Sequence, residues 1–110
     1  MRLKDKVAII TGGSRGIGFA TANKFLYEGA KVIITAHTQP SADRAVQTLK
    51  DKHPDSVIVG ISPNLASLES VRSEFQKVID KYGRIDILVN NAGISESTPF
   101  EKYTEEVFNR

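Results

Sequence analysis

The sequence contains no cysteine and no tryptophan, and only two of its 110 residues are histidines. Without cysteine the chain can form neither disulfides nor thiolate metal sites, and His37 and His53 belong to no cluster of metal ligands, so we expect no metal centre. The sequence also lacks an excess of one charge, because its 15 lysines and arginines are nearly balanced by 13 aspartates and glutamates. The basic residues are scattered along the chain. We therefore expect no nucleic-acid partner.

Long apolar runs are lacking as well. The first six residues are mostly charged, and no apolar stretch is long enough for a signal peptide or a membrane span. We therefore expect a cytoplasmic protein with no membrane partner. A length of 110 residues leaves room for one domain at most, with a modest core.

The most informative segment that is present lies near the amino terminus. The β-branched apolar run Val7–Ile10 is followed by Gly12, Gly16 and Gly18, and then by a helical pattern that extends to about Glu28. The backbone N–H groups of such a turn and the positive end of the helix dipole attract a pyrophosphate, and glycine allows it to approach closely. A tight β–α turn without any ligand uses the same residues, but the flanking strand and helix favour the phosphate-binding interpretation.

The rest of the chain alternates between short apolar runs and helical patterns. We expect further strands at Lys31–Thr35, Ser56–Ile61 and Asp86–Asn90. We expect one helix that begins at Pro40-Ser41, a second between Ser67 and Gly83, and a third within residues 98–110. Strands that alternate with helices predict an α/β fold with a parallel sheet and right-handed crossovers. Continuously apolar strands are typical of a sheet that helices cover on both faces.

Two motifs in register carry a resemblance to a known family. Thr11-Gly12-x-x-x-Gly16-Ile17-Gly18, followed later by Asn90-Asn91-Ala92-Gly93, resembles the signature of the classical short-chain dehydrogenases/reductases. The resemblance covers essentially all 110 residues but only the front of that fold. It implies the N-terminal half of a Rossmann-type doubly wound parallel sheet with strand order 3-2-1-4. Residues 1–110 would then be the dinucleotide-binding part of a single, truncated domain. Both motifs would end strands at the reversal of strand order, where ligands bind.

The resemblance implies a nicotinamide dinucleotide as cofactor. The implied contacts are Gly12, Ser14, Arg15, Gly16, Ile17 and Gly18 in the turn, His37 after the second strand, Asn64 and Leu65 after the third, and Asn90, Ala92 and Gly93 after the fourth. Many family members have Asp where this chain has Asn64, but an amide oxygen accepts the same hydrogen bond from adenine. Ordinary turn chemistry explains Asn64 and the Asn90–Gly93 segment equally well, so position is the main argument for them.

The choice between NADP and NAD depends on the end of the second expected strand. The segment Ala36-His37-Thr38 lacks the carboxylate that would accept hydrogen bonds from the ribose hydroxyls of NAD and repel a 2′-phosphate. Arg15 could hold that phosphate bidentately, although a solvated surface arginine is the alternative. His37 is a further candidate, while exposed histidines are more often inert. We expect NADP, with NAD as the second choice.

The catalytic residues of the family cannot be carried over to this chain. Similar enzymes use a Ser, a Tyr-x-x-x-Lys pair and an Asn, and the family layout places the Asn just beyond Arg110 and the others later. We expect none of Tyr27, Tyr82 and Tyr103 to be the catalytic tyrosine. The chain would then be the cofactor-binding part of an oxidoreductase for a small carbonyl or alcohol substrate, and inactive alone. We also expect a homo-oligomer. A non-catalytic nucleotide-binding or interaction module is the alternative.

Overall fold

The computed structural model describes residues 2–13, 16–63 and 67–90. The helix expected within residues 98–110 therefore lies outside the described residues. The described elements are β1 (Val7–Thr11), α1 (Gly16–Tyr27), β2 (Lys31–Thr35), α2 (Gln39–Lys52), β3 (Ile58–Ile61), α3 (Leu68–Tyr82) and β4 (Ile87–Asn90). Strands and helices alternate strictly, as the sequence pattern predicts.

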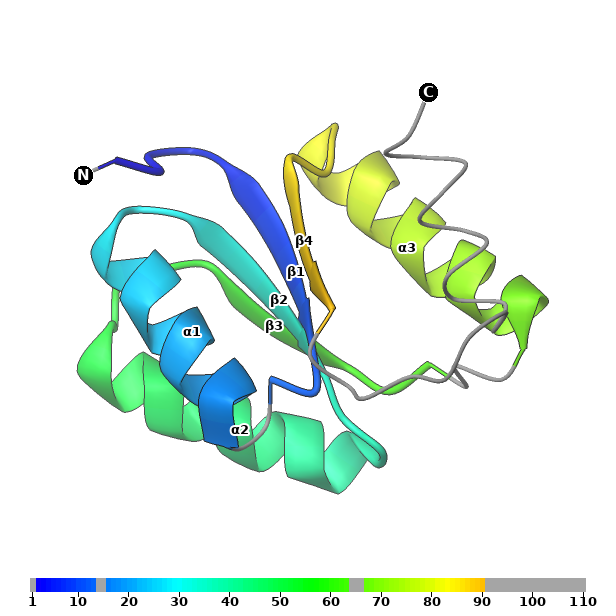
Figure 1. The fold of residues 1–110 in the computed structure, drawn as a ribbon, viewed down its shortest axis with the longest axis horizontal. Coiled ribbons are helices and arrows are strands. Elements are labelled where there is room, and N and C mark those ends of the chain that lie inside the picture. The colour runs from blue at the N-terminus through cyan, green and yellow to red at the C-terminus, as the bar shows by residue number, and fades with distance from the viewer. Residues whose placement is uncertain (1, 14–15, 64–66, 91–110) are drawn as a thin grey trace.

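The four strands form one parallel sheet in the order β3-β2-β1-β4, which confirms the expected order (Figure 1). Every residue of β1 is buried, and in β2 only the first residue is partly exposed. The chain runs outward from β1 to β3 and then returns to place β4 on the other side of β1. The reversal of strand order therefore lies at β1 and β4, whose carboxyl ends meet at one side of the sheet (Figure 1).

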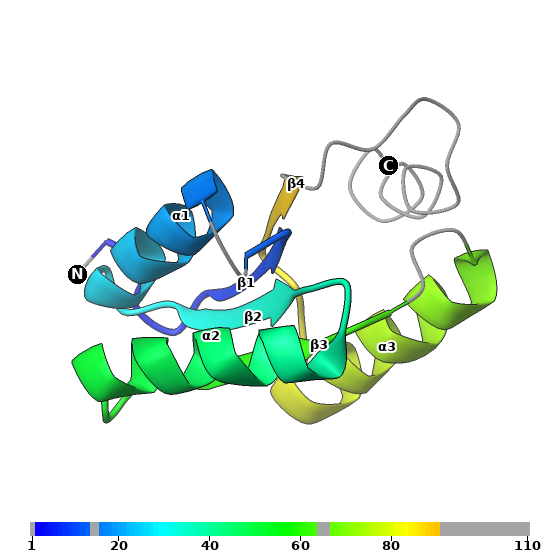
Figure 2. The same cartoon turned by 90° about the horizontal axis from the view of Figure 1, so that it is seen from below.

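Helices cover both faces of the sheet (Figure 2). Ile10 and Ile34 of the two central strands pack with residues of α1 and α2 on one face. Their neighbours Ile9 and Ile33 point to the other face and pack with α3, where Phe75 is fully buried. Because successive side chains of a strand point to opposite faces, an uninterrupted apolar run is what a sheet covered on both faces requires.

The helix ends follow local signals in the sequence. The hydroxyl of Ser67 accepts a hydrogen bond from the N–H of Ser70 at 3.2 Å and caps α3, as expected. At the other end Gly83 adopts a left-handed φ of 85°, and its N–H donates to the carbonyl of Ile79 at 2.7 Å. Helix α2 begins at Gln39, one residue before the expected start at Pro40-Ser41, and Thr38 is its N-cap. Pro40 lies inside the first turn, where its missing N–H costs no hydrogen bond.

Candidate functional site

The glycine-rich turn leaves β1 at the carboxyl edge of the sheet and is held there by Thr35, the last residue of β2. The N–H of Gly12 donates to Oγ1 of Thr35 at 3.2 Å, and the N–H of Gly13 donates to the Thr35 carbonyl at 3.1 Å. Gly12 has a left-handed φ of 67°, which glycine adopts without strain. The beginning of the turn is therefore folded back against the end of β2.

Gly13 lies so close to β2 that no side chain fits. A Cβ atom at this position would be 2.6 Å from Cγ2 of Ile34, a fully buried residue of the core. The family signature leaves position 13 open, and sequence reasoning did not single it out. Its requirement for glycine comes from the approach of the turn to the neighbouring strand.

The first turn of α1 offers a favourable place for an anion. The first N–H groups of a helix have no acceptor inside the helix, and the helix dipole makes this end positive. This turn contains no acidic residue that would repel a phosphate. Gly16 begins the helix with φ 62°, and Ile17 beside it is 76% exposed, whereas Gly18 is buried. Ligands with phosphate groups commonly bind at such a helix start.

The two strands at the reversal are tied together next to this turn. The hydroxyl of Thr11, at the end of β1, donates to the carbonyl of Val89 in β4 at 3.3 Å. In the register of the two strands Thr11 lies opposite Asn90. The two sequence motifs therefore come together at one edge, although about eighty residues separate them along the chain.

An open depression of about 490 Å³ lies between α1 and α2 beside the turn. It is lined by Gly16, Phe19, His37, Ser41, Arg44, Ala45 and Thr48. None of these residues is acidic, and Nη2 of Arg44 donates to the hydroxyl of Ser41 at 3.3 Å. The depression is thus lined by His37, which the sequence predicts as a contact, and by Arg44, which sequence reasoning missed. The helical spacing of residues 41, 44, 45 and 48 on one face of α2 was the signal that could have found it.

The structure describes only part of the predicted cofactor site. Gly12, Gly16, Ile17, Gly18 and His37 lie in the turn, in the first turn of α1 and just after β2, and Asn90 ends β4. Ser14, Arg15, Asn64, Leu65, Ala92 and Gly93 lie outside the described residues. The predicted positions that are described gather at the carboxyl edge of the sheet.

One tyrosine does precede a lysine by four residues, namely Tyr27 before Lys31. Tyr27 is the last residue of α1 and Lys31 is the first residue of β2, so both lie at the opposite, amino-terminal edge of the sheet. Tyr27 is 62% exposed, and its ring packs edge-on against His53, with 4.6 Å between the ring centroids. This pair therefore has the spacing of a catalytic pair but not its location.

Metal ligands do not cluster in the part of the chain that the structure describes. Over residues 2–13, 16–63 and 67–90, no three histidine, cysteine, aspartate or glutamate side chains are grouped to hold an ion. None of the helices described there is both long and apolar enough to cross a membrane.

Comparisons with known proteins agree with this geometry. A family model described as short chain dehydrogenase matches residues 6–110. A 3alpha-hydroxysteroid dehydrogenase of Mediterraneibacter gnavus is 46% identical over 110 residues, which are 100% of this chain and 44% of that protein. A 3-oxoacyl-[acyl-carrier-protein] reductase of Chlamydia muridarum is 40% identical over 107 residues, covering 94% of this chain and 42% of the relative. The chain thus spans less than half the length of these curated relatives.

Solved structures give the same result. A metagenomic short-chain oxidoreductase in complex with NADP superposes with a TM-score of 0.78 at 31% identity, over 86% of this chain and 42% of the other. L-sorbose reductase from Gluconobacter frateurii, complexed with NADPH and L-sorbose, has a TM-score of 0.77 at 36% identity, over 87% of this chain and 37% of the other. The likeness extends over most of the described fold.

Proposed function

Because the chain belongs to the short-chain dehydrogenase family, we propose that residues 1–110 form the dinucleotide-binding part of an oxidoreductase that acts on a small carbonyl or alcohol substrate. The observation that carries this proposal is the position of the glycine turn and the start of α1 at the reversal between β1 and β4. In open α/β sheets this crevice is the usual place for a nucleotide.

The described residues fit such a cofactor. Gly12 and Gly16 present backbone without side chains, and the first turn of α1 carries no acid, so a pyrophosphate can approach the helix start. When bound, a nicotinamide dinucleotide supplies or accepts the hydride. The chain itself would contribute binding and orientation. The N–H groups in the first turn of α1 would hold the phosphates, and Thr11 and Thr35 fix the strand ends next to them.

We further propose that NADP is preferred over NAD. Among the described residues, no aspartate or glutamate lines the depression beside His37, and Arg44 is one of the residues that line it. Arg15, which the sequence places inside the glycine turn, is the other cation in this proposal. A 2′-phosphate would therefore meet positive charge and no repelling acid. The similar structures that hold NADP or NADPH support this choice by analogy.

The catalytic Ser, Tyr and Lys are proposed to lie outside this chain. All 110 residues of this chain align with the M. gnavus relative, but they cover only 44% of that protein. The polypeptide encoded by the complete reading frame is thus expected to oxidise NADPH in the presence of a suitable carbonyl compound. The 110-residue chain alone should give no turnover above the buffer rate with the same compounds.

A pair of glycine variants tests the binding site. Gly16 and Gly83 both adopt left-handed backbone, with φ of 62° and 85°, and a Cβ atom at either position meets nothing within 4 Å. Gly16→Ala and Gly83→Ala should therefore cost a similar strain of about 1–2 kcal/mol. In the complete polypeptide, calorimetry should show NADPH binding weakened about tenfold or more by Gly16→Ala alone, because a strained backbone at the helix start would turn an N–H away from the anion.

Three outcomes separate the alternatives. Failure of the complete polypeptide to bind NADPH or NADH would overturn the proposal. Binding of a dinucleotide without turnover on any of a broad set of carbonyls and alcohols would favour a non-catalytic nucleotide-binding module. Equal loss of binding in Gly16→Ala and Gly83→Ala would move the site away from the glycine turn.

A further inference from the structure

We propose that Thr35 is a positioning residue, which directs the N–H groups of the glycine turn so that those at the start of α1 are left for the pyrophosphate. This inference rests on the proposed function. Thr35 is 2% exposed, and it holds the N–H groups of two consecutive residues, Gly12 through its hydroxyl and Gly13 through its carbonyl. A single residue at the end of β2 thereby fixes the direction in which the chain leaves β1.

These contacts decide which N–H groups remain for a ligand. The N–H groups of Gly12 and Gly13 point toward β2, because Thr35 accepts both. Among the described residues of the turn and the helix start, an anion at the carboxyl edge would then meet the N–H groups in the first turn of α1, which begins at Gly16. The glycines at the beginning of the turn therefore serve its shape, and those at its end serve the ligand.

Packing alone does not explain a threonine at this position. The three residues before Thr35 in β2, Val32–Ile34, are buried in a core of valine and isoleucine. Valine has nearly the same shape as threonine, so it would fill the space at position 35 equally well. A buried hydroxyl is unfavourable unless it is hydrogen-bonded, and here it accepts from Gly12. The contact to the turn is thus the physical reason for the hydroxyl.

Thr35 also connects the two ends of the proposed cofactor site. Ala36 follows it and donates its N–H to Ile61 of β3 at 3.1 Å, and His37 then reaches the depression beside α2. The segment proposed to meet the ribose and its phosphate is therefore continuous with the residue that holds the glycine turn. Loss of the Thr35 hydroxyl removes the bond to Gly12 but leaves the bond from Ala36 to β3, so it should weaken the pyrophosphate contact more than the contact with the 2′-phosphate.

Two substitutions and two ligands test this role in the complete polypeptide. Thr35→Val keeps the shape and removes the hydroxyl, whereas Thr35→Ser keeps the hydroxyl. Thr35→Val should raise the dissociation constant for NADPH about tenfold, the factor expected for one hydrogen bond. Thr35→Ser should leave the dissociation constant close to that of the parent protein. Binding of 2′-AMP, which lacks a pyrophosphate, should change by less than about twofold in either variant by the same estimate.

The results distinguish this inference from the proposed function. If the parent protein binds no dinucleotide, the proposed function fails. If the parent binds NADPH and Thr35→Val binds it equally well, or if NADPH and 2′-AMP weaken by the same factor, the positioning role is refuted while the proposed function stands. A melting temperature for each variant separates a loss of folding from a loss of binding.

Amide hydrogen exchange on the parent protein provides a test that needs no variant. The N–H groups of Gly12 and Gly13 should be protected before NADPH is added and gain little from it. The N–H groups of Ile17 and Gly18 should become protected only when NADPH binds. Rapid exchange at Gly12 and Gly13 in the free protein, followed by protection on binding, would overturn the inference.

Discussion

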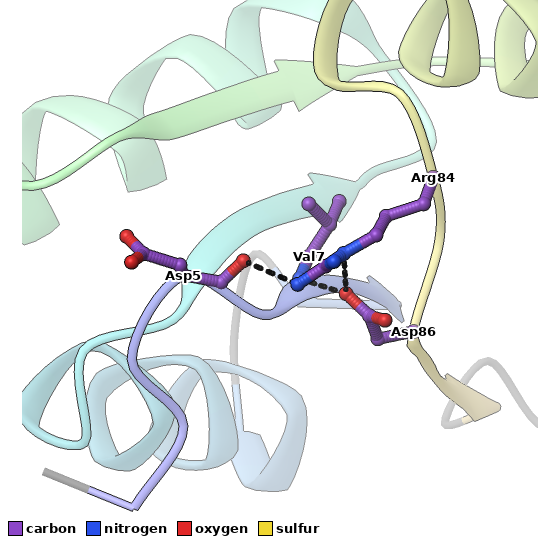
Figure 3. Close-up of polar contacts among 4 residues, drawn as sticks. All are labelled: Asp5, Val7, Arg84 and Asp86. Carbon is purple, nitrogen blue, oxygen red and sulfur yellow. Dashed lines mark hydrogen bonds and ion pairs between the residues drawn. The ribbon is translucent and has the colours of Figure 1, made fainter.

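The carboxylate of Asp86 accepts a hydrogen bond of 2.8 Å from the backbone N–H of Val7, across 79 positions of the sequence (Figure 3). The same oxygen accepts from Nε of Arg84 at 2.8 Å, and Nη2 of Arg84 donates to the carbonyl of Asp5 at 3.2 Å. The first residues of β1 and the residues before β4 are thus fastened together. This clamp lies at the edge of the sheet opposite the proposed cofactor site and fixes the register of the two strands.

Removal of the Asp86 carboxylate should destabilise the fold. Asp86→Ala leaves the N–H of Val7 without its acceptor, and we expect the free energy of unfolding to fall by about 1–3 kcal/mol, the usual cost of an unsatisfied buried group. Asp80→Ala is the control. That exposed aspartate accepts a hydrogen bond from the Gln76 side chain of its own helix, and its removal should change the free energy by about 0.5 kcal/mol or less. Urea unfolding curves measure both. Equal effects would contradict the role of the clamp.

Stability should decrease in acid in a way that depends on Asp86. Burial raises the pKa of this carboxyl, but the hydrogen bonds from Val7 and Arg84 and the nearby positive charges together bring the pKa below its ordinary value of 3.8. A carboxyl whose pKa is lowered by folding contributes its stabilisation above the unfolded pKa and loses it as the pH falls through the folded pKa. Urea unfolding at a series of pH values from neutral to below 3.8 should show this loss. In Asp86→Asn that part of the pH dependence should be absent, and an unchanged profile would contradict the assignment.

Cofactor preference should depend on two arginines. Arg15→Ala should weaken NADPH binding by about one to two decades and hardly affect NADH, because a charge-assisted contact to the 2′-phosphate contributes about 1.5–3 kcal/mol. Arg44→Ala should act in the same direction, since Arg44 lines the depression beside His37. Lys50→Ala, an exposed position on the same helix outside that lining, is the control for a general change in charge. Equal losses for NADPH and NADH would argue against 2′-phosphate recognition.

Self-association of the 110-residue chain is a further expected outcome. Among the described residues β4 pairs with β1 only, and Ile87–Asn90 contains neither charge nor proline to protect its outer edge. Light scattering after size exclusion should therefore show oligomers at about tens of micromolar, where exposed edges associate. Amide exchange at residues 87–89 should slow as the concentration rises. A monodisperse monomer, or an oligomer whose β4 amides stay fast, would contradict pairing through this edge.

The sequence by itself determined those features that depend on neighbouring residues. An unbroken, β-branched apolar run such as Val7–Ile10 is typical of a strand buried on both faces. Ser67 begins its helix and Gly83 ends it through hydrogen bonds to residues three or four positions away. The alternation of such elements predicts a parallel sheet, and two motifs in register with a family predict the strand order.

Only the tertiary structure decided which distant residues meet. Thr35 looks like an ordinary strand residue until the turn folds back and Gly12 reaches its hydroxyl. Gly13 gains its significance from Ile34 of β2, and Arg44 from the depression that it shares with Gly16 and Phe19 of α1. The physical reason is that burial, close approach and hydrogen-bond partners across the sheet depend on how whole elements pack. A pattern along the chain records which elements form, but not which side chains they bring into contact.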